Sequence, residues 1–340
     1  MYLKLAIYFL LFVTITSSSS YDWEIFKHNY NKKYATIIEE AERQKIFLEN
    51  VNRIHEYRRI HPEATFQIGM NHLMDRRSAE LVSIKSKPVF NIRSTEIKKS
   101  IQSELRVPVS LDWREKGVIT PVYSQGMQAT DAAIVAVEVI ESYQAIRGGK
   151  LEKGSVDQVY ACCENKIDIL DCILNKMGGK LCAADDYNKS STECSTKSCK
   201  PFAVFNNVKT IELANENDML QWIQDSPLYV GIDAAQFSFQ IYTTGVYSDT
   251  TCSKTDVDHV LQLVGYGIYS GIPYWLCKNS WGPTWGDQGY ILIERGTNTC
   301  GIAEYVAQVE FKTNDVTRLS LVNHICLTVF CFVLHLFSNF

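Results

Sequence analysis

The positions of the cysteines constrain the fold of this chain more than any other feature. Nine of the eleven cysteines fall between residues 162 and 300, and none precedes residue 162. Cysteines concentrated in one region are typical of a disulfide-bonded domain that folds in an oxidising compartment. The sequence therefore predicts a disulfide-linked core in the second part of the chain and a cysteine-free first part.

The N-terminus points to the same compartment. Met1 to Lys4 form a short basic start, Leu5 to Val13 an apolar run, and Thr14 to Ser20 a small polar exit. This order is typical of a cleaved secretory signal, and the apolar run has about half of the roughly 20 residues that a membrane-spanning helix needs. We therefore expect residues 1–20 to be a signal peptide, and the protein to be extracellular, lysosomal or held at the cell surface.

Composition excludes two classes of protein. Hydrophobic residues make up 46% of the chain and charged residues 21%, which provides enough apolar surface for a core and excludes a wholly disordered protein. The net charge is -4 and no dense basic block occurs, so we do not expect nucleic acid as a partner.

Hydrophobic spacing divides the chain near residue 106. Residues 21–106 are charged and helical in pattern, whereas turns and short strands follow Pro108. The segment from Asp131 to Arg147 is strongly apolar and predicts a buried helix that begins at Asp131. The short β-rich runs are residues 228–233, 260–268, 274–278 and 289–294. We therefore expect an α+β fold of two halves with a cleft between them.

Short motifs point to a known family. In chain order they are Trp113-Arg114-Glu115-Lys116-Gly117, Thr120-Pro121-Val122, Gln125-Gly126, Asp258-His259, Val264-Gly265-Tyr266-Gly267, Asn279-Ser280-Trp281-Gly282 and Trp285-Gly286-Asp287-Gln288-Gly289-Tyr290. A chain with these motifs in this order resembles the papain-like cysteine peptidases of the cathepsin L type. The resemblance covers residues 21 to about 311. It implies a papain-like fold with a helical left lobe and a β-rich right lobe, preceded by a helical propeptide.

The first region resembles the inhibitory propeptide of that family. Two motifs match, the first at Glu39, Arg43, Phe47, Asn50 and Ile54 and the second at Gly69, Asn71, Leu73 and Asp75. Arg58 departs from the last position of the first motif, and Leu73 replaces the usual phenylalanine of the second. The resemblance implies an inhibitory propeptide bound in cis (21–106) and a peptidase domain (107–312). We expect these to be preceded by the signal peptide (1–20) and followed by a hydrophobic tail (313–340).

Asp131 stands at the position of the family's nucleophilic cysteine. His259 and Asn279 follow it by 128 and 148 residues, close to the spacing of roughly 130 to 150 residues in the family. The resemblance implies that His259 is the general base and that Asn279 orients its ring. It also implies that Trp281 shields this pair from water and that Gln125 donates a hydrogen bond to the oxyanion.

A carboxylate does not replace the thiolate in this chemistry. Attack of Asp131 on an amide would form an anhydride, which is more reactive than the peptide, so acylation runs uphill. Two interpretations of Asp131 stay open: it reproduces the charge of the lost thiolate beside His259, or it is an ordinary helix N-cap. Thr130 and Ser124 are nearby hydroxyls, but each is offset from the nucleophile position. We therefore expect a catalytically inactive homologue.

The substrate groove also departs from the family pattern. Gln128 stands where the family has a cysteine, and Ala132 replaces an aromatic residue. The Cys-Asn-Gly-Gly segment that carries the partner of that cysteine is missing after Cys163. Both ends of one disulfide and one wall of the cleft are therefore expected to be absent.

The resemblance implies two disulfides, Cys252–Cys300 and Cys163–Cys199. Four further cysteines are additional to these: Cys162, Cys172, Cys182 and Cys194. A Cys182–Cys194 bridge would close a short loop, but spacing alone leaves the connectivity open. Cys277 lies in an apolar strand and is expected to be a buried free thiol. Since the other cysteines of this region are expected in disulfides, we expect neither a metal nor a cofactor.

The C-terminal tail is a separate feature. Leu319 to Phe337 contain no Lys, Arg, Asp or Glu and are mostly apolar over 19 positions, a length that just spans a bilayer. The alternatives are a membrane anchor, a signal exchanged for a glycolipid, and a surface helix or a faulty gene end.

Three functions fit these observations. The first is a decoy whose cleft binds peptides or cysteine-protease inhibitors. The second is residual hydrolysis by an unusual nucleophile, and the third is a structural or storage role. We favour the decoy.

Overall fold

The computed structural model describes residues 22–82, 107–123, 131–163, 168–187, 194, 199–211 and 215–312. We call residues 22–82 the N-terminal region and residues 107–312 the main domain. The predicted signal peptide, Gln125, Gln128 and the hydrophobic tail lie outside the described residues. Within the described ranges, no helix combines the length and the apolar character that crossing a membrane requires.

Most helices of the main domain come first along the chain, and most of its strands follow. The helices of the described residues are α2 (Ile37–Ile60), α3 (Asp131–Ile146), α4 (Val156–Cys163), α5 (Ile169–Met177), α6 (Glu216–Trp222) and α7 (Phe237–Gln240), and residues 22–29 are also helical; α2 and residues 22–29 belong to the N-terminal region. Short 3-10 turns are Ser78–Glu80, Trp113–Lys116 and Thr299–Gly301. The strands are β1 (Phe66–Ile68), β2 (Leu111–Asp112), β3 (Lys180–Cys182), β4 (Pro201–Val204), β5 (Asn207–Ile211), β6 (Leu228–Ile232), β7 (Tyr242–Tyr247), β8 (His259–Tyr269), β9 (Ile272–Lys278), β10 (Tyr290–Glu294) and β11 (Val306–Glu310).

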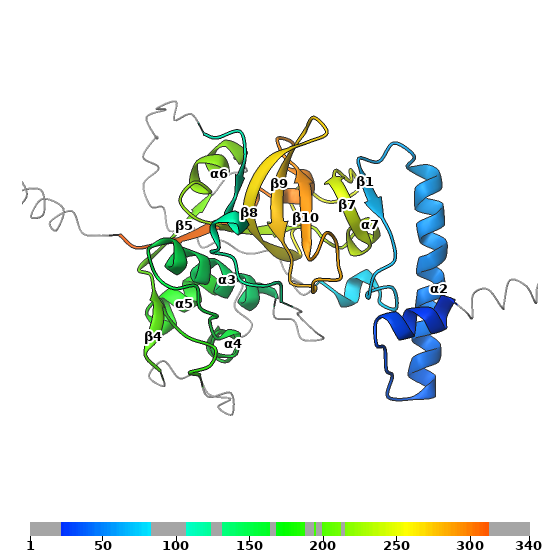
Figure 1. Ribbon diagram of the computed structural model, residues 1–340, viewed down its shortest axis with the longest axis horizontal. Coiled ribbons are helices and arrows are strands. Elements are labelled where there is room, and N and C mark those ends of the chain that lie inside the picture. Colours follow the sequence, from blue (N-terminus) through cyan, green and yellow to red (C-terminus); the bar gives the residue numbers. More distant parts are fainter. Residues whose placement is uncertain are drawn as a thin grey trace, which may run out of the picture.

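One large sheet organises the described part of the chain. Its strand order is β1-β7-β10-β9-β8-β6-β11-β5, and β2 pairs with β8. Helices α3, α4 and α5 lie together beside this sheet, and α2 lies on the far side of β7 (Figure 1). Two hydrophobic cores follow from this layout, one among the helices against β6, β8 and β11, and one among the strands.

Helix α3 is the central element of the helical lobe. Its residues from Ala133 to Tyr143 are buried, including Val135, Val137 and Val139, because the helix is apolar on most of its circumference and its two buried glutamates have partners inside the fold. The helix predicted from Asp131 to Arg147 is thus observed as Asp131–Ile146.

The N-terminal region contributes an edge strand to the sheet. Strand β1 pairs antiparallel with β7, with Phe66 opposite Gly245. Gly245 has a φ of +87°, and a Cβ there would approach the carbonyl oxygen of Thr65 to 2.6 Å. Only glycine allows this close pairing without strain. Helix α2 of the same region buries Phe47 and Ile54 in the hydrophobic core among the strands.

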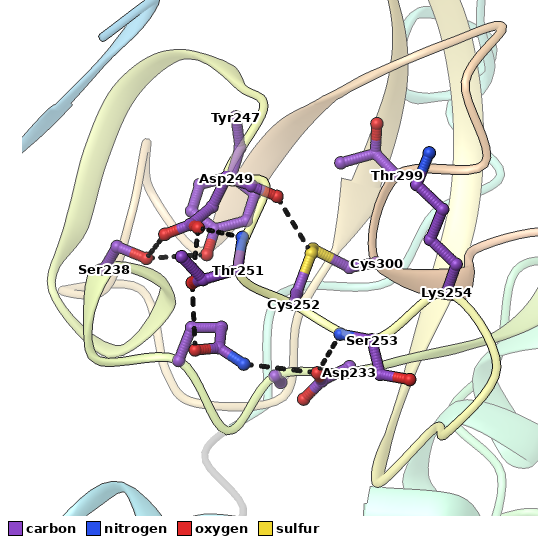
Figure 2. Close-up of a disulfide and its surroundings, with 12 residues drawn as sticks. Asp233, Ser238, Tyr247, Asp249, Thr251, Cys252, Ser253, Lys254, Thr299 and Cys300 are labelled. Carbon is purple, nitrogen blue, oxygen red and sulfur yellow. Dashed lines mark hydrogen bonds between the residues drawn. A yellow bond between two sulfur atoms is a disulfide. The ribbon is translucent and has the colours of Figure 1, made fainter. Parts of the chain in front are cut away.

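The β-rich lobe contains the disulfide Cys252–Cys300, the pair that the resemblance implies. Figure 2 shows it next to Asp249, which accepts hydrogen bonds from Ser238 and from the backbone N–H of Thr251. The carboxylate of Asp249 therefore holds the loop that leads into Cys252.

The pair Cys163–Cys199, which the resemblance implied, is wrong, and the Cys182–Cys194 bridge that the spacing left open does not form. Within the described ranges, the helical lobe has the disulfides Cys162–Cys194, Cys163–Cys172 and Cys182–Cys199. The reason is local packing. Helices α4 and α5 pack together, which brings Cys163 to Cys172. Strands β3 and β4 pair with Cys182 opposite Pro201, so Cys182 lies near Cys199. In the described part of the chain, Cys277 is free and buried.

Candidate active site

Three elements bring the sequence-predicted site residues together. Asp131 is the first residue of α3, His259 is the first residue of β8, and Asn279 directly follows β9. Strands β8 and β9 are antiparallel neighbours, with Gln262 opposite Lys278. The start of one strand therefore lies beside the end of the other, and the N-terminus of α3 faces both.

The side chains of these residues form a buried row. Nδ1 of His259 lies 3.0 Å from Oδ2 of Asp131, and Nε2 lies 2.8 Å from Oδ1 of Asn279. Asp131 is 1% exposed, and His259 and Asn279 are 0% exposed. Both ring nitrogens of His259 are therefore occupied by neighbours from the same chain.

Hydrogen bonding determines where the ring protons lie. Oδ1 of Asn279 accepts from the backbone N–H of Ser280 at 2.8 Å, so this atom is the amide oxygen. Nε2 of His259 therefore donates to it. A hydrogen bond between Nδ1 and Asp131 needs a further proton, held by the imidazolium or by the carboxyl group. Asp131 and His259 thus share one proton in addition to the proton on Nε2.

Aromatic rings cover this row. The ring of Trp281 lies 4.9 Å from that of His259 and packs edge-on against Phe239 and Trp285. Trp281 is only 4% exposed. It therefore lies where the sequence predicted a shield over the His259–Asn279 pair, whereas Gln125 falls outside the described residues.

A further carboxyl group adjoins the row. Burial raises the pKa of Asp258 to about 6, against the lowering effect of a hydrogen bond from the backbone N–H of Ala234. The negative charges of Asp233 and Asp131 raise this pKa further, and His259 lowers it. Proton uptake near this site is therefore expected in mildly acidic solution.

Beneath the row lies a buried ionic cluster that the sequence reasoning missed. Nζ of Lys278 lies 2.7 Å from Oε1 of Glu138, and both side chains are fully buried. Glu141 accepts hydrogen bonds from Oγ1 of Thr120 at 2.6 Å and from the backbone N–H of Gly154 at 2.7 Å. Burial raises the pKa of Glu138, and it raises the pKa of Glu141 to about 7. Two acidic residues inside an otherwise apolar helix were the available signal.

This cluster ties the helical lobe to the sheet next to the site. Lys278 directly precedes Asn279, and Glu138 lies two turns after Asp131 on α3. The ion pair thus fixes α3 against β9. Among the described residues, no group of three or more His, Cys, Asp or Glu side chains is arranged to hold a metal ion.

Comparisons with known proteins agree with this geometry. A family model described as papain family cysteine protease matches residues 107–309, and one described as cathepsin propeptide inhibitor domain matches residues 23–81. Cathepsin S of Bos taurus is 32% identical over 306 residues, covering 85% of this chain and 92% of its own. Digestive cysteine proteinase 3 of Homarus americanus is 31% identical over 328 residues, covering 88% and 98%.

Solved structures of precursors share the fold. Digestive procathepsin L 3 of Tenebrio molitor larval midgut superimposes with a TM-score of 0.72 at 25% identity, over 86% of this chain and 99% of that chain. A recombinant stem bromelain precursor gives 0.73 at 27% identity, over 87% and 100%. The predicted α+β fold with a helical propeptide is confirmed.

Proposed function

The chain belongs to the papain family of cysteine proteases, and we propose that it is a proteolytically inactive member whose cleft binds peptides or protease inhibitors. The N-terminal region, which we now call the propeptide, is bound in cis to the main domain.

One observation carries the proposal. Proteolysis by this family's chemistry needs a thiolate that attacks the carbonyl and an imidazole that passes a proton to the leaving amine. Here the nucleophile position holds Asp131, whose carboxyl oxygen lies 3.0 Å from Nδ1 of His259. Asn279 occupies the other nitrogen. His259 therefore keeps the hydrogen-bonding arrangement of a general base, but the group beside Nδ1 is a carboxyl group instead of a thiol.

The same contacts favour a retained binding surface. Asp131 and His259 together form a neutral pair that shares a proton, as a thiolate and an imidazolium would. The negative charge of Asp131 interacts favourably with the dipole at the N-terminus of α3, so the local structure is stabilised although peptide hydrolysis does not occur. Trp281 stays packed over His259. A partner that recognises the part of the cleft around His259 and Trp281, such as a cysteine-protease inhibitor, would therefore meet family-like residues there, next to a groove that lacks one wall.

The cellular setting follows from the sequence. We infer that residues 1–20 direct the chain into the secretory pathway, where the four disulfides of the described residues would form. Residues 313–340 are proposed to hold the protein at a membrane, directly or through a glycolipid.

The test uses full-length protein from which an added protease has removed the propeptide, with that protease then inactivated. Turnover of a fluorogenic peptide library, labelling by a thiol-directed probe, and equilibrium binding of non-covalent family inhibitors are measured. We expect no turnover and no labelling at position 131. We expect the inhibitors to bind saturably and a peptide mixture to displace them. The Asp131→Cys variant is the matched control, because it should label. Turnover that His259→Ala abolishes would overturn the inactivity, and a cleft that binds no peptide or inhibitor would overturn the binding role.

A further inference from the structure

Gln240, at the end of α7 in the main domain, directs its side chain to the propeptide. Nε2 donates to the carbonyl oxygens of Leu73 and Arg76, both at 2.8 Å. Oε1 accepts from Oγ of Ser78 at 2.8 Å. Gln240 is fully buried. Within the described part of the chain, its side-chain hydrogen bonds thus all cross from the main domain to the propeptide.

The backbone of Gln240 takes part in the same contact. Its carbonyl oxygen accepts from Nδ2 of Asn71 at 2.9 Å and from Nε1 of Trp285 at 3.1 Å. The ring of Trp285 lies 5.5 Å from that of Trp281, which covers His259. The propeptide contact and the candidate site are therefore joined through two packed rings.

The propeptide turn that Gln240 contacts is held independently from within the propeptide. Nδ2 of Asn50 on α2 donates to the carbonyl oxygens of Met74 at 2.9 Å and Arg76 at 3.0 Å. The carbonyl of Arg76 thus accepts from two buried amides, one from each part of the chain. Asn50 fixes the shape of the turn, and Gln240 attaches that turn to the main domain.

We propose that Gln240 is the main-domain residue that holds the turn at residues 71–78 of the propeptide on the main domain. Two of its three side-chain bonds go to main-chain carbonyls, so it recognises the backbone of the turn rather than a particular side chain. When the propeptide leaves, the amide of Gln240 and the carbonyls of Leu73 and Arg76 lose their hydrogen bonds to one another. Hydrogen bonds to water then have to compensate for this loss. The contact joins the propeptide to the main domain whatever the cleft binds, so the proposal does not depend on the proposed function.

The experiment compares two glutamines on one segment of the full-length chain. Gln236 lies four residues before Gln240. Its side chain donates a hydrogen bond to Asp233 and accepts one from Thr251, both in the main domain and not in the propeptide. Hydrogen exchange is followed at the backbone amides of residues 71–81 in Gln240→Ala and Gln236→Ala. We expect exchange to quicken about 10- to 100-fold in Gln240→Ala, since three bonds to the propeptide are lost, and to change less than about threefold in Gln236→Ala.

Protection of the β8 amides reports whether each variant is folded, and it should match the unmodified chain. Ser78→Ala, which removes only one of the three bonds, is the second variant and should quicken exchange about 3- to 10-fold even if Gln240→Ala does not fold. Equal exchange at residues 71–81 in folded Gln240→Ala and Gln236→Ala, or unchanged exchange in Ser78→Ala, would overturn the proposal. Because no cleft ligand is measured, this result is independent of whether the cleft binds peptides.

Discussion

Nδ1 of His259 lies 3.0 Å from Oδ2 of Asp131, in a position where the family chemistry requires a thiol. The carboxyl group keeps the buried histidine hydrogen-bonded and provides no suitable nucleophile for an amide. Asn279, from the end of β9, holds the opposite nitrogen. The site therefore has the residue arrangement that the resemblance implies, with a carboxyl group at the nucleophile position, and on this we base the proposal of inactivity.

This relationship predicts how substitutions of Asp131 change stability. Asp131→Ala leaves Nδ1 of the buried His259 without its partner, and we expect the free energy of unfolding to fall by about 1–3 kcal/mol. Asp131→Asn retains a side chain that pairs with Nδ1 and should cost less. Chemical denaturation of the three full-length proteins measures both values. An alanine variant as stable as the original chain would contradict the account.

Restoring the thiol should restore little activity. Asp131→Cys places a nucleophile beside His259, but Gln128 and the absent Cys-Asn-Gly-Gly segment leave the groove altered. Misplacement of a substrate by about 1 Å costs on the order of a hundredfold in rate. We therefore expect kcat/KM on peptide substrates at least about 100-fold below that of a digestive cysteine proteinase assayed alongside. Comparable values would show that the groove is intact.

The buried carboxyl of Glu141 predicts a pH dependence of stability. Its folded-state pKa is raised to about 7 by burial, against about 4.3 in an unfolded chain. The folded state therefore retains a proton that the unfolded state loses. The stabilisation is complete below about pH 4 and is lost as the pH rises to about 7, by about 4 kcal/mol in total. Glu141→Gln should remove this part of the slope in denaturation measured from pH 4 to 8. An unchanged slope would exclude Glu141 as its source.

Acid should not trim the propeptide. Self-processing needs a nucleophile, and position 131 holds a carboxylate. Mass spectrometry of protease-free full-length protein, kept at about pH 4 to 5, should show residues 21–106 still attached. A protease added in trans should release them. Spontaneous cleavage near Val107 at a rate independent of protein concentration would contradict this prediction, because it would show that the chain has a catalytic group although the family's thiol is absent.

Much of the site was predictable because the motifs fix the register. His259 and Asn279 lie where their distance along the chain from Asp131 placed them, and all three meet within hydrogen-bond distance. The run 260–268 predicted most of β8, observed as His259–Tyr269, because a mostly apolar run, interrupted by Gln262, marks a strand buried on both faces.

Features that depend on long-range pairing were not predictable. The partner of Cys163 follows from the packing of α4 on α5, and that of Cys182 from the pairing of β3 with β4. The three-residue strand β1 carries no distinct pattern, and it forms because β7 offers it an edge. Glu138 and Lys278 are 140 residues apart, so only the fold shows that they neutralise one another.

Peptide turnover by the unmodified main domain tests the central claim most directly. The propeptide is removed from full-length protein with an added protease, which is then inactivated, and hydrolysis of a fluorogenic peptide library is followed in parallel with the His259→Ala variant. The account predicts the same background signal from both proteins, because Asp131 provides no nucleophile for an amide. Turnover above background in the unmodified protein that disappears in His259→Ala would contradict it.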